Sequence, residues 1–342
     1  MPPLEVLFIG GTGEISAACS HRAVELGMNL HVLNRGLASL RALPAEATLL
    51  TADVRDREAA RAAIRDREFD VVVNFVAFTP DHVQADIDLF AGRAGQYVFI
   101  SSASAYQTPP AKLPITESTA LRNPVWPYSQ AKIACEDLLV RAYRESAFPA
   151  TIVRPSHTYD RTQVPYDTGW TMIDRMRRGK EVVVHGDGTS LWTLTHSEDF
   201  AKGFVGLLGR PQALGESFHI TSDEVLTWNQ IHELLAAAAG TEARIVHVPS
   251  DAILGYDEEW GRALLGDKSH SLIFDNTKIR RLVPDYTATI PFAHGAREII
   301  DWYDADQARR RVDPRIDRLM DDLVEAFGPA PTSTLDAAAT SR

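Results

Sequence analysis

Tyr128 and Lys132, four positions apart, have the residue types and spacing for proton transfer from an alcohol. On a helix this spacing puts both side chains on one face, one turn apart, so an ammonium group lies near a phenol. A nearby positive charge lowers the pKa of a phenol, and the phenolate can then take a hydroxyl proton as hydride leaves the carbinol. Such pairs also occur on ordinary amphipathic helices. The elements around the pair decide between the two interpretations.

A glycine-rich turn lies at the start of the chain. The apolar run 4–9 predicts a strand, and the pattern that ends near Leu26 predicts a helix. Gly10 permits the tight turn between them, Gly13 lets backbone N–H groups approach a pyrophosphate, and the helix N-terminus favours the anion. Ser16 stands where a third glycine often lies and is small enough for close packing. We expect cofactor contacts from Gly10, Gly11, Thr12, Gly13, Glu14 and Ile15.

Strands and helices alternate after this turn. The patterns predict strands at 30–34, 48–51, 69–75, 96–102 and 149–155, and helices at 56–66, 80–92 and 128–146. Continuous apolar runs suit strands covered on both faces, so we expect a doubly wound parallel sheet of the Rossmann type in the α/β class. Residues 1–155, joined by segments returning from the C-terminal half, would form the NAD(P)-binding domain. A smaller α/β substrate-binding lobe would follow at 156–327, with a disordered tail at 328–342.

The carboxyl ends of the predicted strands carry further cofactor candidates. Asn34 can hydrogen-bond the ribose diol of NAD, whereas Arg35 could meet the 2′-phosphate of NADP. We expect NAD, and Arg35 leaves NADP open. Asp53 could meet the adenine amino group, although a helix N-cap explains it equally well. The expected contacts from these strand ends are Asn34, Arg35, Asp53, Val54, Phe75, Val76 and Ala77.

The motifs, taken in order, resemble those of the extended short-chain dehydrogenases/reductases, and within them the NAD-dependent sugar epimerase/dehydratase family. The resemblance extends from the glycine turn to about residue 305. It implies that Ser102 is the catalytic hydroxyl, that Tyr128 is the general base and also contacts the cofactor, and that Lys132 binds the nicotinamide ribose and lowers the pKa of the tyrosine. Its motifs are Gly10-Gly11-Thr12-Gly13, the strand end Phe99 to Tyr106, Tyr128-x-x-x-Lys132, Val153-Arg154-Pro155 followed by Tyr159, and Gly186-Asp187-Gly188-Thr189.

In this family the C-terminal lobe caps the carboxyl ends of the strands, where ligands bind. We expect its helices near 168–178, 197–208 and 227–239, and its strands near 182–185, 217–220 and 244–247. Each pocket candidate is also explained as an ordinary structural residue, and Ser104 by strand-end hydrogen bonding. The substrate-contact candidates are Ser104, His157, Tyr159, Tyr166, Trp192 and His196.

One departure from the family bears on the substrate. Members that use nucleotide-diphosphate sugars usually have an Arg-Asp pair after the Gly-Asp-Gly motif, and here those positions are Trp192 and Thr193. An arginine grips a diphosphate, whereas an indole can stack on a sugar or a base. We therefore expect a sugar, glycoside or nucleoside without a diphosphate. Alternatively, Trp192 belongs to the core and another cation grips the diphosphate, with Arg161, Arg178 and Arg280 as candidates.

A second departure bears on the reaction. Members that dehydrate at the 4,6 positions typically carry an Asp-Glu pair after the catalytic hydroxyl, and this chain has Ala103-Ser104. We expect transient oxidation of a ring hydroxyl followed by epimerisation, and a dehydratase that uses Tyr128 or a pocket histidine stays open. The alternatives are a net NADPH-dependent reductase, a nucleotide-diphosphate-sugar epimerase, and a dinucleotide sensor without turnover. Intact Ser102, Tyr128 and Lys132 favour an enzyme over a sensor.

Composition limits the partners. The 342 residues carry a formal charge of −11, which disfavours nucleic acid and anionic membrane surfaces. Two cysteines, Cys19 and Cys135, predict no disulfide framework, and no long apolar run predicts a membrane span, so we expect a cytoplasmic protein without a metal. The helices at 80–92 and 128–146 are apolar on more than one face. In the family the corresponding helices pair across a two-fold axis, which implies a homodimer.

Overall fold

Seven parallel strands form the main sheet of the computed structural model, which describes residues 2–37 and 40–329. The strand order is β11-β6-β5-β4-β1-β2-β3, and every neighbouring pair is parallel. The predicted Rossmann-type sheet is therefore confirmed. The strands are β1 (Glu5–Ile9), β2 (Asn29–Asn34), β3 (Thr48–Thr51), β4 (Phe69–Asn74), β5 (Ala94–Ile100), β6 (Ala150–Pro155) and β11 (Ser217–Ile220).

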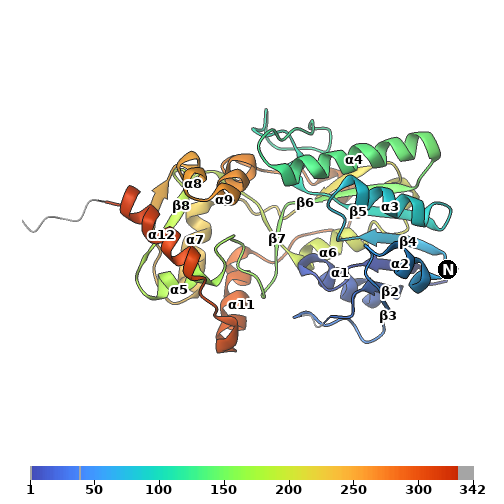
Figure 1. The fold of residues 1–342 in the computed structure, drawn as a ribbon, viewed down its shortest axis with the longest axis horizontal. Coiled ribbons are helices and arrows are strands. Elements are labelled where there is room, and N and C mark those ends of the chain that lie inside the picture. Colours follow the sequence, from blue (N-terminus) through green and yellow to red (C-terminus); the bar gives the residue numbers. More distant parts are fainter. Residues whose placement is uncertain (1, 38–39, 330–342) are drawn as a thin grey trace, which may run out of the picture.

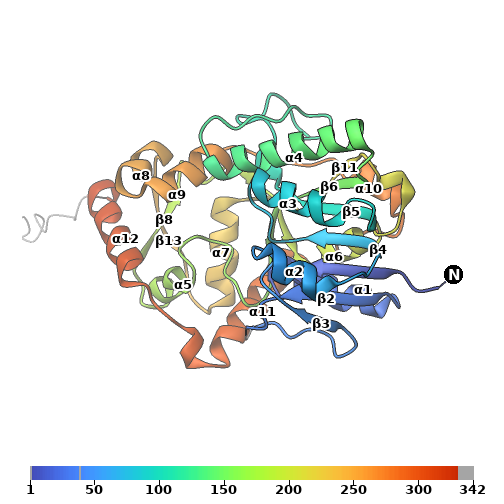
Figure 2. The same ribbon diagram turned by 45° about the vertical axis from the view of Figure 1, so that its right-hand side comes forward.

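Helices cover both faces of this sheet, and alternate strand residues point to opposite sides. Val6 and Phe8 of β1 pack on one side with α1 (Glu14–Glu25), α6 (Ser197–Val205) and α10 (Thr277–Leu282). Leu7 and Ile9 pack on the other side with α2 (Arg57–Ile64), α3 (Pro80–Phe90) and α4 (Pro127–Ser146). Figure 2 shows α3 and α4 side by side along this second face.

Two pieces that we expected in the C-terminal lobe complete the main sheet instead. α6 packs against α1, and β11 pairs with β6, with Ser217 opposite Ile152. The sequence pattern located both elements to within three residues. Their partners depend on a crossover that returns the chain from the second lobe to the edge of the sheet, and local periodicity carries no information about such a crossover.

The second lobe is built around its own apolar core and smaller strand pairs (Figure 1). β8 (Glu181–His185) pairs in parallel with β13 (Arg244–Val248), and β7 (His157–Tyr159) pairs in parallel with β10 (Leu194–His196). β9 (Leu191–Trp192) and β12 (Leu226–Thr227) are antiparallel. The longer helices around these strands are α5 (Trp170–Arg177), α7 (Trp228–Ala238), α8 (Ser250–Tyr256), α9 (Glu258–Ala263), α11 (Phe292–Asp304) and α12 (Pro314–Phe327). A short π-helix occupies Leu264–Lys268.

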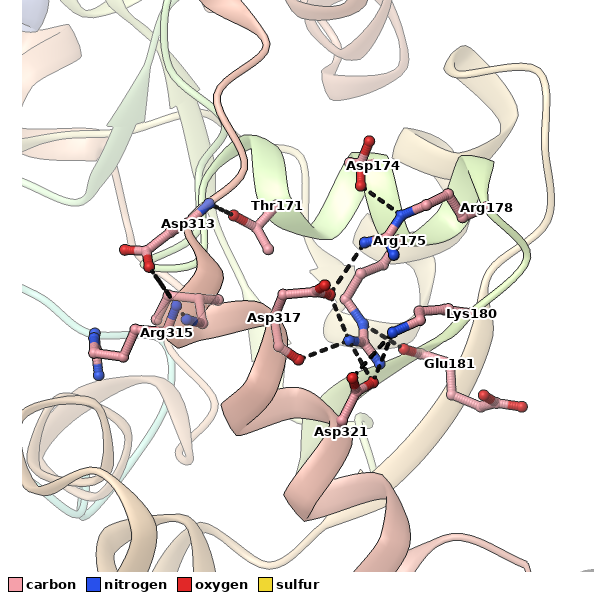
Figure 3. A network of polar contacts seen from close by, with 11 residues as sticks. Thr171, Asp174, Arg175, Arg178, Lys180, Glu181, Asp313, Arg315, Asp317 and Asp321 are labelled. Atoms are coloured by element: carbon pink, nitrogen blue, oxygen red, sulfur yellow. Dashed lines mark hydrogen bonds and ion pairs between the residues drawn. The ribbon is translucent and has the colours of Figure 1, made fainter.

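A buried arginine holds the last helix, α12, on the second lobe (Figure 3). The Arg175 side chain is 1 % exposed, and its Nη1 lies 2.6 Å from Asp317 Oδ1 and 2.8 Å from Asp321 Oδ1. Leu319 and Leu323 of α12 join the apolar core of the lobe. Burying an arginine between two carboxylates is tolerable because the charges are paired and hydrogen-bonded. The aspartate-rich face of α12 therefore docks in one orientation.

The structure can be compared with the expectations about cysteines, membrane spans, metal sites and the C-terminal tail. Cys19 and Cys135 are free, buried thiols. Within residues 2–37 and 40–329, no helix has the length and apolarity to cross a bilayer, and no cluster of three metal-binding side chains occurs. Residues 330–342 of the expected tail lie outside the described part of the chain.

Candidate active site

A cleft of about 1050 Å³ runs along the carboxyl ends of β1 to β4. Ligands of open parallel sheets bind at this edge. Most of the expected cofactor contacts line the cleft, together with Arg55, Phe78 and Thr158. The expected residues that line it are Gly10, Thr12, Gly13, Glu14, Ile15, Asn34, Arg35, Asp53, Val54, Phe75 and Val76.

The glycine turn has the geometry that a dinucleotide requires. Gly10 has φ +85°, and a Cβ added there would lie 2.6 Å from Val76 Cγ1, so a larger residue would be strained and would clash. Gly13 is the N-cap of α1, whose first-turn N–H groups have no partner within the helix. Gly11 does not line the cleft. A Cβ there would meet Val32 and Ser20, so Gly11 serves strand-to-helix packing, and its expected cofactor contact is absent from this geometry.

The structure changes the expectations for two other cofactor candidates, Ala77 and Asp53. Ala77 is fully buried away from the cleft, and its carbonyl oxygen accepts a hydrogen bond from Lys132. Asp53 is not the helix N-cap, because the Asp56 side chain accepts the N–H groups of Glu58 and Ala59 at the start of α2. Asp53 lines the cleft instead, which leaves its expected role near the adenine open.

Lys132 lies at the end of this cleft, 2 % exposed. Its Nζ donates to the carbonyl oxygens of Ala77 (2.8 Å) and Ile100 (2.7 Å), at the ends of the neighbouring strands β4 and β5. It also stands 4.8 Å from the centre of the Phe78 ring, which lines the cleft. Burial lowers the pKa of Lys132 to about 8. The lysine is thus fixed where the nicotinamide end of a dinucleotide is expected.

Tyr128 lies beside Lys132, with the lysine Nζ 5.8 Å from the centre of its ring. A side-chain hydrogen bond with Ser102 lowers the pKa of Tyr128, but desolvation outweighs it and Asp267 repels the phenolate, so the pKa rises to about 12. We expected Lys132 to hold this tyrosine near its phenolate form. In this structure it does not, because the ammonium group is directed at two carbonyl oxygens.

Ser102 and Ser104 belong to one hydroxyl network. Their Oγ atoms are 2.9 Å apart, and Ser129 at the start of α4 donates to Ser104 Oγ at 2.7 Å. Asn123 donates to the Ser104 carbonyl oxygen and to that of Gly266 in the π-helix. Ser104 is 4 % exposed, so hydrogen bonding at the strand end explains it and little of its surface is open to a substrate. Ser102 keeps its bond to Tyr128.

A buried ion pair supports the strand end behind Ser102. Glu136, one turn after Lys132 on α4, accepts hydrogen bonds from Arg154 at 2.6 to 3.2 Å and from Ser101 at 2.5 Å. The pair is nearly inaccessible to solvent, so both charges depend on this bidentate contact. It ties α4, β5 and β6 together. The relative positions of Ser102 and Lys132 follow from it.

One protein family matches this chain over most of its length. The model of the "NAD dependent epimerase/dehydratase family" matches residues 6–221, well over half of the chain. The chain belongs to this family. It has the extended short-chain dehydrogenase/reductase fold that the motifs predicted, and the family's description names NAD as the cofactor.

Individual relatives are distant. The chain is 26 % identical over 258 residues to "Chloroplast stem-loop binding protein of 41 kDa b" of Arabidopsis thaliana, and 27 % identical over 183 residues to "dTDP-glucose 4,6-dehydratase" of Actinoplanes. These alignments cover 71 % and 53 % of this chain and 65 % and 52 % of the relatives. Among solved structures, epimerase Mth375 of Methanothermobacter thermautotrophicus has a TM-score of 0.74 at 17 % identity, over 90 % of this chain and 94 % of that one. At this identity the match shows the shared fold.

Three substrate-contact candidates lie in the core of this family member. Trp192 is 2 % exposed, packs on Trp228 with ring centres 5.2 Å apart, and donates to His157 Nδ1 at 3.1 Å. Tyr159 is 1 % exposed, and His196 is 4 % exposed, with its Nε2 3.2 Å from a Glu298 carboxylate oxygen. Trp192 therefore offers no free ring face for stacking. Strand-end position suggested a pocket, but the second lobe packs over these side chains.

His157 and Tyr166 lie closer to open space. Tyr166 lines a small cavity of about 20 Å³, and its hydroxyl is 2.9 Å from His232 Nδ1. His157 accepts the Trp192 indole N–H, and burial together with the charge of Lys268 lowers its pKa to about 3. A histidine that stays neutral in this way is not a general acid near neutral pH. Among the substrate-contact candidates, Tyr166 lines a cavity in the structure.

The structure adds two residues that sequence reasoning missed, Asp267 and Lys268 at the end of the π-helix. Lys268 is 8 % exposed, its Nζ is 5.3 Å from the centre of the Trp126 ring, and Trp126 lies 4.9 Å from the Tyr128 ring. Burial and repulsion from Asp167 raise the pKa of Asp267 to about 6, and its charge acts on Tyr128. Both residues come from about 140 positions further along the chain. No local pattern marks them as part of the site.

The arginines considered as alternative diphosphate ligands lie elsewhere. Arg178 pairs with Asp174 and Asp317 beside α12 (Figure 3), and Arg280 pairs with Asp223. Arg161 is exposed on the segment that follows β7. The buried cations nearest to Tyr128 that the structure shows are Lys132, beside its ring, and Lys268, on the far side of Trp126.

Proposed function

We propose that this enzyme oxidises one ring hydroxyl of a sugar, glycoside or nucleoside without a diphosphate, and returns the hydride after inversion at the oxidised or an adjacent carbon. The observation that carries the proposal is the meeting of Ser102, Tyr128 and Lys132 next to Phe78 and Ile100, which line the cofactor cleft. A hydroxyl, a phenol and an ammonium group in this arrangement can accept and return a carbinol proton.

The turn formed by Gly10 and Gly13 suits NAD, since both glycines line the cleft without a side chain and a Cβ at Gly10 would meet Val76. First-turn N–H groups of α1 would face the pyrophosphate, Asn34 the ribose diol, and Lys132 the nicotinamide ribose. When bound, NAD supplies a reversible hydride acceptor. The protein's own contribution is the proton. Tyr128, which is 36 % exposed, would first lose its own proton to solvent. Its phenolate oxygen then takes the proton of the substrate hydroxyl while the Ser102 hydroxyl donates to that oxygen, and the same atoms return the proton.

The two residues after the catalytic serine favour inversion over 4,6-elimination. Ala103 and Ser104 are buried, at 3 % and 4 % exposure, and neither carries an acid or a base. Asp267 supplies a carboxyl group near Tyr128 with a pKa of about 6, the kind of group that a second proton transfer needs.

The electrostatics beside Tyr128 argue for a substrate without a diphosphate. Lys132 donates to two carbonyl oxygens, so Lys268 contributes the one further ammonium group, while Asp267 and Asp167 contribute two carboxyl groups. A diphosphate needs more positive charge than one lysine beside two acids provides. The hydroxyl groups of an uncharged sugar can instead donate to the carboxylates and accept from the lysine.

Two observations favour other candidates. A relative is named dTDP-glucose 4,6-dehydratase, which supports a nucleotide-diphosphate sugar as the substrate. Arg35 is exposed and lines the cleft, which supports a net NADPH-dependent reductase. A sensor without turnover has no need of the hydrogen-bonded Ser102 and Tyr128.

Calorimetry on the NAD-loaded enzyme distinguishes these substrates. UDP-glucose and dTDP-glucose should bind with Kd values weaker than about 1 mM, which corresponds to less than roughly 4 kcal/mol of binding energy. A panel of free hexoses, methyl glycosides and nucleosides should contain a tighter ligand that reduces the bound NAD, as seen by absorbance. Micromolar binding of either nucleotide sugar would overturn the proposed substrate class. It would leave the oxidation chemistry in place.

We also propose a homodimer through α3 and α4. Val83, Phe90 and Leu139 of these helices are fully buried within one chain, so they do not contribute to such a contact. Ile87, Leu89, Ile133, Leu138 and Val140 are half-buried and remain available on these helices. Light scattering at micromolar concentration should give twice the chain mass, and Leu138→Glu should give a monomer. A monomer mass for the unmodified protein would contradict the proposal.

A further inference from the structure

A charged pair joins two segments whose residues line the cofactor cleft. Arg41, in the segment between β2 and β3, donates from Nε to Asp160 Oδ2 at 2.5 Å and from Nη2 to Asp160 Oδ1 at 3.1 Å. The same Nη2 donates to Thr162 Oγ1 at 2.5 Å. The pair links positions 119 residues apart, and its side chains are only 18 % and 15 % exposed. Such a bidentate, largely desolvated contact is much stronger than an exposed ion pair.

Glu14 lies between this pair and the glycine turn. It begins α1, lines the cleft together with Thr158 of β7, and shares a side-chain hydrogen bond with Thr158. The charges of Asp160 and Arg41 both act on it. Tyr303 of α11 closes the cluster from the other side, with its hydroxyl donating to the Thr162 carbonyl oxygen at 3.4 Å. The groups that face Glu14 are therefore one arginine, one aspartate and neutral hydroxyls.

The place of the Glu14 carboxyl group in the fold affects cofactor binding. Glu14 occupies the first turn of the helix whose N-terminus faces the pyrophosphate of a bound dinucleotide. An ionised carboxylate there would repel the pyrophosphate, whereas a protonated one would not. Arg41 and Asp160 join two segments that each contribute residues to the cleft, Leu37 on one side and Thr158 and Gln163 on the other, so their contact holds these segments together.

We propose that Glu14, Arg41 and Asp160 form a proton-linked clasp over the cofactor cleft, in which NAD binds with Glu14 protonated and the Arg41–Asp160 contact slows its release. The family to which the chain belongs makes NAD the ligand, and the clasp itself is a property of these three residues. It controls how tightly and how long the cofactor is held.

The direction of the pH effect follows from the protonation state of Glu14. Burial, opposed by the Thr158 hydrogen bond and strengthened by Asp160, raises the pKa of Glu14 to about 7. Below that pH the carboxyl group is neutral, and binding is at its tightest. Above that pH, Glu14 must take up a proton before NAD can bind. The association constant for NAD should therefore fall by up to about tenfold per pH unit. Lys132, with a pKa of about 8 at the other end of the cleft, adds its own dependence, so the comparison must be with a Glu14 variant.

Calorimetric titration with NAD, in buffers that differ in ionisation enthalpy, measures the proton directly. Near neutral pH the wild-type protein should take up a substantial fraction of a proton per NAD bound. Glu14→Gln should lose this uptake and bind NAD more tightly on the alkaline side. Glu25→Gln, the same change at the far end of α1, should behave as wild type. Equal uptake by the wild type and Glu14→Gln would overturn the role of Glu14.

Stopped-flow fluorescence of NADH release tests the other half of the clasp. Arg41→Met should release NADH about 10- to 100-fold faster, the range expected when hydrogen bonds to a charged group are lost. Arg22→Met, which removes an exposed partner of Glu25 on α1, should leave the rate unchanged. Thermal unfolding without cofactor checks that both variants fold. A folded Arg41→Met protein with wild-type release would overturn the clasp.

Discussion

Tyr128→Phe should lower the rate of substrate oxidation by about 10²- to 10⁴-fold, the usual worth of a positioned acid or base. The substitution removes one oxygen atom and with it the hydroxyl that bonds to Ser102. The ring should keep its packing on Trp126, 4.9 Å away. NAD should still bind, because Tyr128 is absent from the wall of the cofactor cleft while the glycine turn and Lys132 are unchanged. Single-turnover absorbance of the reduced cofactor gives the rate, and calorimetry gives the NAD affinity.

Tyr143→Phe is the matched control for this substitution. It lies on the same helix, α4, is 41 % exposed, and is remote from the hydroxyl network of Ser102. It should retain the wild-type rate. If Tyr128→Phe oxidised substrate as fast as the wild type, the proton would have to leave by another group, and Asp267 would become the first one to test.

Most of the main sheet could be predicted from the sequence, because its strands are short apolar runs between helices with clear start signals. The helix expected at 128–146 spans Pro127–Ser146, with proline at its first position and Ala147 in the left-handed conformation at its end. The strand expected at 48–51 has these bounds in the structure. The small strands β7, β9, β10 and β12 were missed, since two or three residues are too few for a period to show.

The candidate catalytic and cofactor residues could be proposed from the sequence for a similar reason: each lies within a few positions of a strand end or helix start. Gly10 follows β1, Ser102 follows β5, and Tyr128 begins α4. The residues on the substrate side of Tyr128 could not be predicted from the sequence. Asp267 and Lys268 reach Tyr128 only because Asn123 and the missing side chain of Gly266 let the π-helix pack against Trp126. That contact is set by tertiary packing, which periodicity and spacing do not describe.

Trp192→Ala should destabilise the protein rather than weaken substrate binding selectively. The indole is 2 % exposed, packs against Trp228, and donates its N–H to His157, so its removal leaves a large cavity and an unpartnered ring nitrogen. Truncating a buried tryptophan typically costs about 3–5 kcal/mol of unfolding free energy. We expect a clear fall in the guanidinium midpoint of the second lobe. An accessible stacking surface, which the sequence suggested, would instead have predicted an unchanged midpoint with a raised KM.

Trp192→Phe separates packing from hydrogen bonding in the same position. It keeps most of the aromatic contact with Trp228 and removes the N–H that His157 accepts, so its cost should be well below that of the alanine variant. Without that donor, His157 would still be buried beside the charge of Lys268, and both effects would keep it neutral near pH 7. If both variants unfolded like the wild type and only KM rose, Trp192 would have to leave the core to meet substrate. The assignment of this residue to structure would then be wrong, and stacking would again explain why tryptophan replaces the family's arginine.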